Sequence, residues 1–213
     1  MRYKKQLLFF IFLLFVMSAG FNTYKKMKFK YFEKQAIKSY VKWDKGSIIV
    51  FATKMLNLNP ENSTSHFLIA SAYNGLGNKK LAYEHYAKLK NSQIMYSVIK
   101  WCERLHETYP NISCYGEIGT AFYHNKQYNE AVKYYEKKLE KFPDSESTHT
   151  ALGIVYDELL QDDKALYHFK KALEIKPNSK IAKKNLDIFE YRRRFLKSSP
   201  ESELNKEVII HLD

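Results

Sequence analysis

The sequence predicts an all-α protein built from pairs of antiparallel helices that stack on one another. Three observations support this. Only seven glycines and five prolines occur among 213 residues, too few for the turns of a many-stranded sheet. Apolar residues recur three and four positions apart, as they do on one face of an α-helix. Residues 115–143 and 149–177 also match one another at a spacing of 34, which indicates a repeated two-helix unit.

The chain begins with a basic and strongly apolar segment. Residues 7–21 contain only one polar residue, Ser18, and as a helix they would span roughly 22 Å, less than the roughly 30 Å core of a bilayer. Three interpretations stay open: a cleaved signal peptide, an uncleaved membrane anchor flanked by lysines, and a buried core helix. The first two send the chain to a membrane. They predict a membrane-anchored, secreted or periplasmic protein whose repeats lie outside the cytoplasm.

The net charge of +12 is concentrated in the same region. The first thirty residues carry seven basic and no acidic side chains. A protein that binds nucleic acid more often carries its excess charge as a stripe on the folded body. The placement of the charge therefore indicates a segment close to a membrane.

Each matching copy has one small residue in each helix and a proline after the second helix. The small residues are expected where the two helices cross most closely, because a larger side chain there would cost about 1–3 kcal/mol. Proline cannot continue a helix and so ends the second one. These residues are Gly119, Ala131 and Pro143 in one copy and Gly153, Ala165 and Pro177 in the next.

The two copies resemble the tetratricopeptide repeat family, whose pattern is W-x2-L-G-x2-Y, then A-x3-F, then P. Residues 115–143 read Y-x2-I-G-x2-F, A-x3-Y and P, and residues 149–177 read H-x2-L-G-x2-Y, A-x3-F and P. His149 thus takes the large-residue position, where packing explains it. The resemblance covers about residues 29–196 and implies a right-handed superhelix of stacked helix pairs. The RNA-binding pentatricopeptide repeats have a similar helix pair but match the small residues and proline less well.

The match weakens on both sides of these copies. Upstream, Ala70 and Ala82 take the small positions of a copy that lacks a closing proline, and residues 30–43 and 48–59 make a degenerate pair. Residues 92–109 form an amphipathic helix outside the repeat register. The predicted segments are a signal or anchor (1–21), a basic juxtamembrane segment with a degenerate first helix (22–45), the repeat array (46–178), a capping helix (179–196) and a tail (197–213).

The two cysteines allow three interpretations. Cys102 and Cys114 lie on either side of a predicted turn at Pro110. In an exported protein they could form a disulfide between neighbouring helices. They could instead be two buried free thiols, or Cys102 could join His106 and His124 in a metal site, which no family spacing supports.

No motif demands catalysis. The sequence contains neither H-E-x-x-H nor G-x-S-x-G, and residues 74–80, which faintly resemble a phosphate-binding loop, lack its Gly-Lys-Ser/Thr ending. We therefore predict that the protein is not an enzyme and has no catalytic, cofactor-binding or metal-binding residues. No cofactor and no small-molecule substrate are expected.

In the tetratricopeptide family the first helix of each pair lines a concave groove that holds a peptide or helix of a partner protein. The resemblance implies such a groove here, mixed and mildly aromatic, suited to an apolar anchor on the partner. The alternative is that these are ordinary exposed side chains without a single ligand. The predicted partner-binding residues are Phe67, Ser71, Asn74, Glu117, Thr120, Tyr123, His124, Ile154, Asp157 and Glu158.

Together these observations predict a membrane-associated or exported scaffold that binds another protein and carries no chemistry of its own. The alternative is a basic helical-repeat protein that binds RNA, which salt-dependent retention of RNA would reveal. The position of the charge favours the first prediction, so no nucleic-acid partner is expected.

Overall fold

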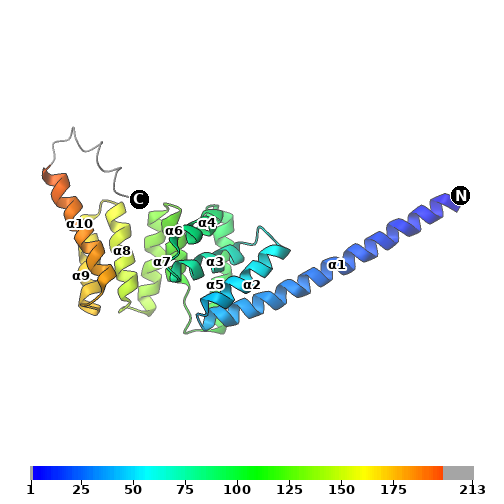
Figure 1. The fold of residues 1–213 in the computed structure, drawn as a ribbon, viewed down its shortest axis with the longest axis horizontal. Helices are drawn as coiled ribbons and strands as arrows, with labels where there is room; N and C mark the ends of the chain where they lie inside the picture. Colours follow the sequence, from blue (N-terminus) through cyan, green and yellow to red (C-terminus); the bar gives the residue numbers. More distant parts are fainter. Residues whose placement is uncertain (1, 199–213) are drawn as a thin grey trace. The chain divides into compact units, whose positions relative to one another are not determined.

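The computed structural model describes the backbone of residues 2–198 and the side chains of residues 17–195. Every element in this part of the chain is a helix (Figure 1). The helices form two compact units, a first unit of Met1–Ile112 and a second unit of Ser113–Asp213. The predicted all-α fold is therefore confirmed for the described residues, whereas the right-handed superhelix stays a prediction.

The first unit begins with one long helix. Residues 30–43, predicted as a separate degenerate helix, are largely the C-terminal end of α1, which is continuous from Arg2. This end packs against α2, and α2 packs against α3; Ala36 and Tyr40 of α1 are buried. The helices of this unit are α1 (Arg2–Val41), α2 (Lys45–Leu58), α3 (Ser63–Gly75), α4 (Lys79–Tyr86), the short 3-10 helix η1 (Ala87–Leu89) and α5 (Ser92–Thr108).

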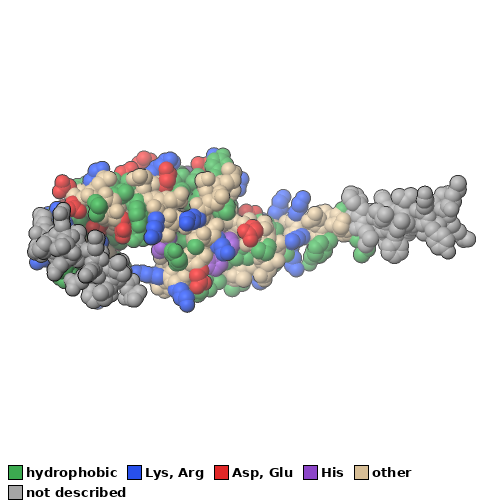
Figure 2. All heavy atoms as spheres, turned by 90° about the horizontal axis from the view of Figure 1, so that it is seen from above, with side chains coloured by type: hydrophobic (Ala, Val, Ile, Leu, Met, Phe, Trp, Pro, Cys, Tyr) green, Lys and Arg blue, Asp and Glu red, His purple; other side chains and the backbone are tan. Residues whose placement is uncertain are grey.

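Most of the predicted apolar segment, residues 7–21, lies outside the side chains that the structure describes. Within the part that is described, no helix has the length and apolar character needed to cross a membrane. The signal, anchor and core-helix interpretations therefore stay predictions. The next stretch of α1 is exposed and strongly basic, as Figure 2 shows for its blue side chains. Its exposed lysines are Lys25, Lys26, Lys28 and Lys30.

Helix α5 occupies the segment that lies outside the repeat register. It packs against α3 through a buried apolar stripe that includes Val98, Trp101 and Leu105. The Trp101 ring makes edge contacts with Phe67 of α3 and Tyr40 of α1, with ring centroids 6.2 Å and 6.0 Å apart. The extra helix is thus part of the core of the first unit.

The second unit consists of two helix pairs and a final helix. Helix α6 pairs with α7 and α8 pairs with α9, while α7 also packs against α8. The final helix packs against both α8 and α9, where the ring of Phe189 lies 5.6 Å from that of Phe169. The helices are α6 (Tyr115–His124), α7 (Tyr128–Lys141), α8 (Glu146–Glu158), α9 (Asp162–Ile175) and α10 (Lys180–Ser198).

The crossing of each pair in the second unit depends on a glycine that faces an aromatic ring. A Cβ atom added at Gly119 would lie 2.8 Å from Cδ1 of Tyr135, and one added at Gly153 would lie 2.6 Å from Cδ1 of Phe169. The ring lies four residues after the small residue of the second helix, Ala131 or Ala165, and both alanines are fully buried. The glycine therefore makes room for the ring. The sequence analysis had expected the glycine to lie where the helices cross closely, but it had not identified the ring as the group that the glycine faces.

The first helix of every pair ends in the same turn. One residue there has a positive φ, and the next backbone N–H donates across the turn to the carbonyl five residues before it, at 2.9–3.0 Å. This bond is the mark of a Schellman helix end. Since Trp43 and Gly77 are 34 positions apart, α1 and α2 form a repeat in the same register as α3 and α4. The positive-φ residues are Trp43, Gly77, Lys126 and Leu160.

We expect Gly153→Ala to lower the free energy of unfolding by about 1–3 kcal/mol, because the new methyl group overlaps the Phe169 ring. Gly46→Ala in α2 is the matched control: its methyl group would meet only the side chain of Asp44, at 3.7 Å. This control should change stability by no more than about 1 kcal/mol, in the stabilising direction. Urea unfolding followed by circular dichroism measures both; equal effects of the two substitutions would contradict the crossing geometry.

Candidate functional site

The structure separates the three residues of α3 that were predicted to face a partner. Phe67 is fully buried against Trp101 of α5, and Ser71 is buried as well, whereas Asn74 is exposed. The prediction of Phe67 and Ser71 as partner-binding residues is therefore corrected. Helix α5 packs against α3, where Phe67 contacts Trp101, and both Phe67 and Ser71 are buried in the first unit.

The predicted residues of the second unit come from two neighbouring helices. Helix α6 supplies four of them and α8 supplies three, and the two helices are in contact. Six of them are half-buried, and Glu158 is exposed. These seven residues are called the α6–α8 face below; they are Glu117, Thr120, Tyr123, His124, Ile154, Asp157 and Glu158.

Tyrosine rings connect the two helices of this face. The Tyr123 ring lies 5.5 Å from that of His124 and 5.9 Å from that of Tyr128 in α7. Tyr128 in turn donates a hydrogen bond from its hydroxyl to Glu158, at 3.5 Å. Burial, followed by the neighbouring Glu158, raises the pKa of Tyr123. Tyr128 is thus a member of the site that the sequence did not indicate, because it belongs to a second helix.

A basic residue of α10 reaches the same face. Arg192 forms an ion pair with Asp157, and Arg193 pairs with Asp162 at 3.1 Å. The α10 helix therefore neutralises one carboxylate of the α6–α8 face. No spacing in the sequence predicted this contact, since Arg192 and Asp157 are 35 residues apart.

Glu117 is the carboxylate of this face with the least compensation. Its Oε2 atom is buried and has no hydrogen-bond partner, and burial raises the pKa of its carboxyl group, with the charge of Lys138 opposing the shift. The neighbouring Thr120 hydroxyl is already committed to the Gly116 carbonyl at 2.9 Å and to the Tyr135 hydroxyl at 3.0 Å.

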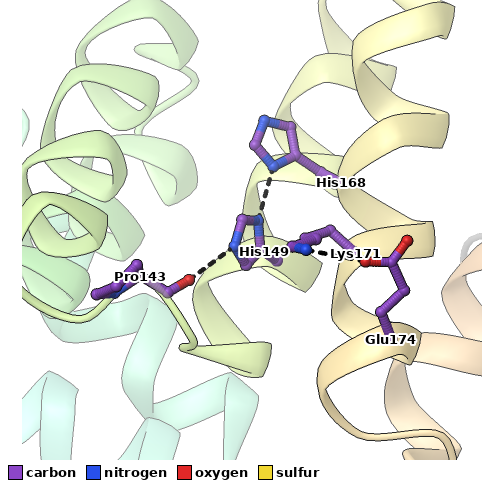
Figure 3. A network of polar contacts seen from close by, with 5 residues as sticks. All are labelled: Pro143, His149, His168, Lys171 and Glu174. Carbon is purple, nitrogen blue, oxygen red and sulfur yellow. Dashed lines mark hydrogen bonds and ion pairs between the residues drawn. The ribbon is translucent and has the colours of Figure 1, made fainter.

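Two histidines form a hydrogen-bonded pair beside the crossing of α8 and α9. Nδ1 of His149 lies 3.0 Å from Nδ1 of His168, and Nε2 of His149 lies 3.0 Å from the carbonyl oxygen of Pro143 (Figure 3). Burial, followed by the neighbouring His149, lowers the pKa of His168 to about 4. The sequence explained His149 by packing alone, and its burial agrees, but packing does not account for the partner histidine.

The same arrangement occurs in the first unit, 83 positions earlier. Nδ1 of His66 lies 2.9 Å from Nδ1 of His85, and Nε2 of His66 lies 3.0 Å from the Pro60 carbonyl oxygen. The copy between them, α6 and α7, has Tyr115 and Tyr134 at these positions, with ring centroids 6.3 Å apart. The sequence did contain a signal for these pairs, because two histidines 19 residues apart occur twice. A comparison at a spacing of 34 does not reveal it, since the copy between them has tyrosines at these positions.

Both cysteines are disulfide-bonded, so neither Cys102 nor Cys114 is a free thiol. This state agrees with the disulfide interpretation and removes the one in which Cys102 binds a metal. His106 instead pairs through Nδ1 with the Ile112 carbonyl oxygen, at 3.1 Å. Among the residues that the structure describes, no three histidine, cysteine or acidic side chains are grouped as metal ligands.

Stacked antiparallel helix pairs with a small residue at each crossing define a helical-repeat protein. Residues 111–178 match the family model of the tetratricopeptide repeat, so the chain carries tetratricopeptide repeats in this segment, as the sequence motifs predicted. This fold points to a scaffold for protein–protein interaction, and the family is generally non-catalytic.

Several solved structures have a similar fold. MamA from Desulfovibrio magneticus RS-1, from residue 41 to its end, is 16% identical over 80% of this chain and 88% of that chain, with a TM-score of 0.47. Another MamA crystal structure is 20% identical over 75% and 84%, with a TM-score of 0.43. PilF from Pseudomonas aeruginosa is 17% identical over 80% and 71%, with a TM-score of 0.41. A search of curated proteins found no match.

Glu117→Gln should raise the midpoint of thermal unfolding at neutral pH. The folded state raises the pKa of this carboxyl group, so it binds more protons there than the unfolded chain does, and the cost of Glu117 grows as the pH rises through its ordinary range. The gain should therefore be larger at pH 8 than at pH 5.

Glu140→Gln, an exposed change on α7, is the control for this experiment and should have little effect at either pH. Calorimetry of both variants and the natural chain at the two pH values measures the difference. A Glu117→Gln midpoint equal to or below that of the natural chain at pH 8 would show that the carboxylate is compensated.

Proposed function

We propose that the second unit binds a segment of another protein along the α6–α8 face, and that the segment offers a basic side chain next to an apolar or aromatic one. The observation that carries this proposal is the buried Oε2 atom of Glu117, which lacks a hydrogen-bond partner. A buried carboxylate gains most from a cation that arrives together with further hydrogen-bond donors. An arginine or lysine of the partner supplies both.

Tyr123 supports the apolar part of the same proposal. It lies on α6 between His124 and Tyr128, and its ring is partly exposed. Tyrosine offers a large contact area with little loss of side-chain freedom, which is why it is enriched where proteins bind one another. Ile154 of α8 adds an aliphatic side chain to this face. The basic residue of the partner would pair with Glu117 and its apolar residue would pack on Tyr123.

Arg192 supports the charge preference. The α10 helix already places one arginine on a carboxylate of this face, Asp157. The chain thus pairs its own basic side chain with the kind of acidic group that we assign to the partner site. Glu117 and Glu158 make no ion pair among the described residues. Glu158 accepts a hydrogen bond from Tyr128, so Glu117 is the carboxylate that a basic side chain of the partner would compensate most.

We also propose that the chain is exported or held at a membrane by its N-terminal segment. The basic stretch of α1 after that segment supports this, because juxtamembrane lysines attract anionic lipid headgroups. The bonded state of both cysteines agrees with it, since disulfides persist in oxidising compartments. The protein that we infer is a scaffold that presents the α6–α8 face outside the cytoplasm.

The partner site is tested by photo-crosslinking in the native cells. A photoreactive amino acid replaces Tyr123 in one variant and the exposed Tyr167 of α9 in a control variant. We expect a protein adduct at position 123 that is absent at position 167. In the Tyr123 variant, Glu117→Ala should reduce the adduct at least about tenfold, as the loss of a central binding residue does. Equal adducts at both positions, or adducts with RNA that disappear with salt, would contradict the proposal.

The location is tested by sequencing the N-terminus of the mature protein and by treating intact cells with protease. We expect either a mature end close to residues 18–20 or an intact Met1, and in both cases repeats that external protease can digest once outer barriers are opened. An intact Met1 together with repeats that stay protected would contradict export.

A further inference from the structure

We propose that each of the two histidine pairs, His66 with His85 and His149 with His168, binds one divalent late first-row transition-metal ion through its two Nδ1 atoms. Neither pair is needed for the partner site above. The proposal depends on three observations: the distance between the paired nitrogens, the backbone carbonyl that holds one ring of each pair, and the recurrence of the whole arrangement in both units.

The distances suit two ligands of one ion. The paired Nδ1 atoms lie 2.9 Å apart in the first unit and 3.0 Å apart in the second. Histidine nitrogens lie about 2.0–2.1 Å from zinc, so two of them at tetrahedral or neighbouring square-planar positions are roughly 2.9–3.4 Å apart. Both pairs fall in this range without movement of the helices.

The proline carbonyls fix which nitrogen faces the partner ring. A carbonyl oxygen can only accept a hydrogen bond, so Nε2 of His149 carries a proton and donates it to Pro143. The Nδ1 atom of the neutral ring then has a free lone pair, which accepts the proton on Nδ1 of His168. Ligand histidines in metal sites are held in this manner, by a hydrogen bond from the second ring nitrogen to a backbone carbonyl. His66 and Pro60 repeat the arrangement.

Metal binding then needs only a change of tautomer. The proton of His168 moves from Nδ1 to Nε2, which leaves a lone pair on each Nδ1 atom. The cation then lies to one side of the line that joins the two nitrogens, about 2.0–2.1 Å from each, and the rings tilt so that both lone pairs point at it. No redox change and no net loss of a proton accompany this step. The described residues group no third histidine, cysteine or acidic side chain with either pair, so water completes the coordination. Imidazole nitrogens favour nickel, copper and zinc over magnesium or calcium.

The surroundings keep the rings in place. His168 stacks on Tyr156, with ring centroids 5.4 Å apart and planes 12° apart, and Tyr73 lies beside His85 at 6.5 Å. Lys171 of the same helix as His168 is paired with Glu174 at 2.9 Å (Figure 3), so part of its charge is balanced. An ordered ring loses little freedom when it binds an ion, which favours binding by two ligands.

The repeat formed by α6 and α7, which lies between the two histidine pairs in the chain, indicates which substitution can remove a pair. Tyr115 and Tyr134 occupy the equivalent positions of α6 and α7 with their rings in contact, so this helix pair packs without histidine there. Packing alone therefore does not require a histidine pair in the other two copies. Exchange of one pair for two tyrosines, as in His149→Tyr with His168→Tyr, copies a solution that the chain already uses.

The experiment counts nickel ions on the full chain. The protein, in detergent and freed of metal by a chelator, is dialysed against Ni²⁺, and bound nickel is measured by elemental analysis beside a thermal unfolding curve. We expect two ions per natural chain, one after the exchange of either pair, and none after the exchange of both. Nickel should also raise the unfolding midpoint of the natural chain, because an ion that binds the folded state stabilises it.

Two further variants keep the outcome decisive. His124→Gln removes a histidine outside the pairs and should still bind two ions. If a tyrosine exchange fails to unfold cooperatively, His168→Gln and His85→Gln replace it. Each removes one ligand nitrogen and leaves a polar side chain of similar size that can still form hydrogen bonds. Equal nickel on the natural chain and on the chain without either pair would overturn the proposal, whether that amount is zero or two.

Discussion

The contact between a small residue and an aromatic ring at each helix crossing is the constraint on which the repeat depends. Gly119 faces Tyr135 and Gly153 faces Phe169 closely enough that a single methyl group would overlap the ring. One helix pair has an apolar side that it cannot bury by itself, so pairs stack. The glycine–ring contact sets the distance between the two helices of a pair. The apolar side that remains uncovered on the pair then packs against the next pair, as α7 does against α8.

The sequence predicted that the helices of each pair cross closely at a small residue, but it did not predict that the glycine faces the ring of Tyr135 or Phe169. It also predicted residues 30–43 as the first helix of the first pair, but not that this helix is the end of one continuous α1 that starts at Arg2. Apolar periodicity continues without change through a long helix, so it cannot show where a repeat begins inside one. The turn at Trp43 does show it, since its positive φ and its Schellman bond match those at Gly77. No residue preference indicated this turn, because tryptophan is not a residue that favours a positive φ.

The contacts around the α6–α8 face could be predicted only in part, and the contacts that were missed share a cause. Positions on α6 and α8 follow from the repeat, so Tyr123, Asp157 and Glu158 could be named from their spacing. The burial of Phe67 depends on where α5 packs, and the ion pair of Asp157 depends on where α10 places Arg192. Both are contacts between segments without a repeat relationship, which spacing cannot reveal. Tyr128 was missed for a similar reason, since it reaches the face from the second helix of its pair.

The histidine pairs differ from the rest of the core in what their position requires. The equivalent positions of α6 and α7 hold two tyrosines with their ring centroids 6.3 Å apart, so this place beside the crossing can be filled by rings without nitrogen. Histidine adds two ring nitrogens that must be satisfied, and burial of an imidazole disfavours its charged form. Pro60 and Pro143 satisfy one nitrogen of each pair, and the partner histidine satisfies another. Since the same four atoms are arranged alike in two separate units, their chemistry, rather than the volume of the rings, distinguishes these copies from the one between them.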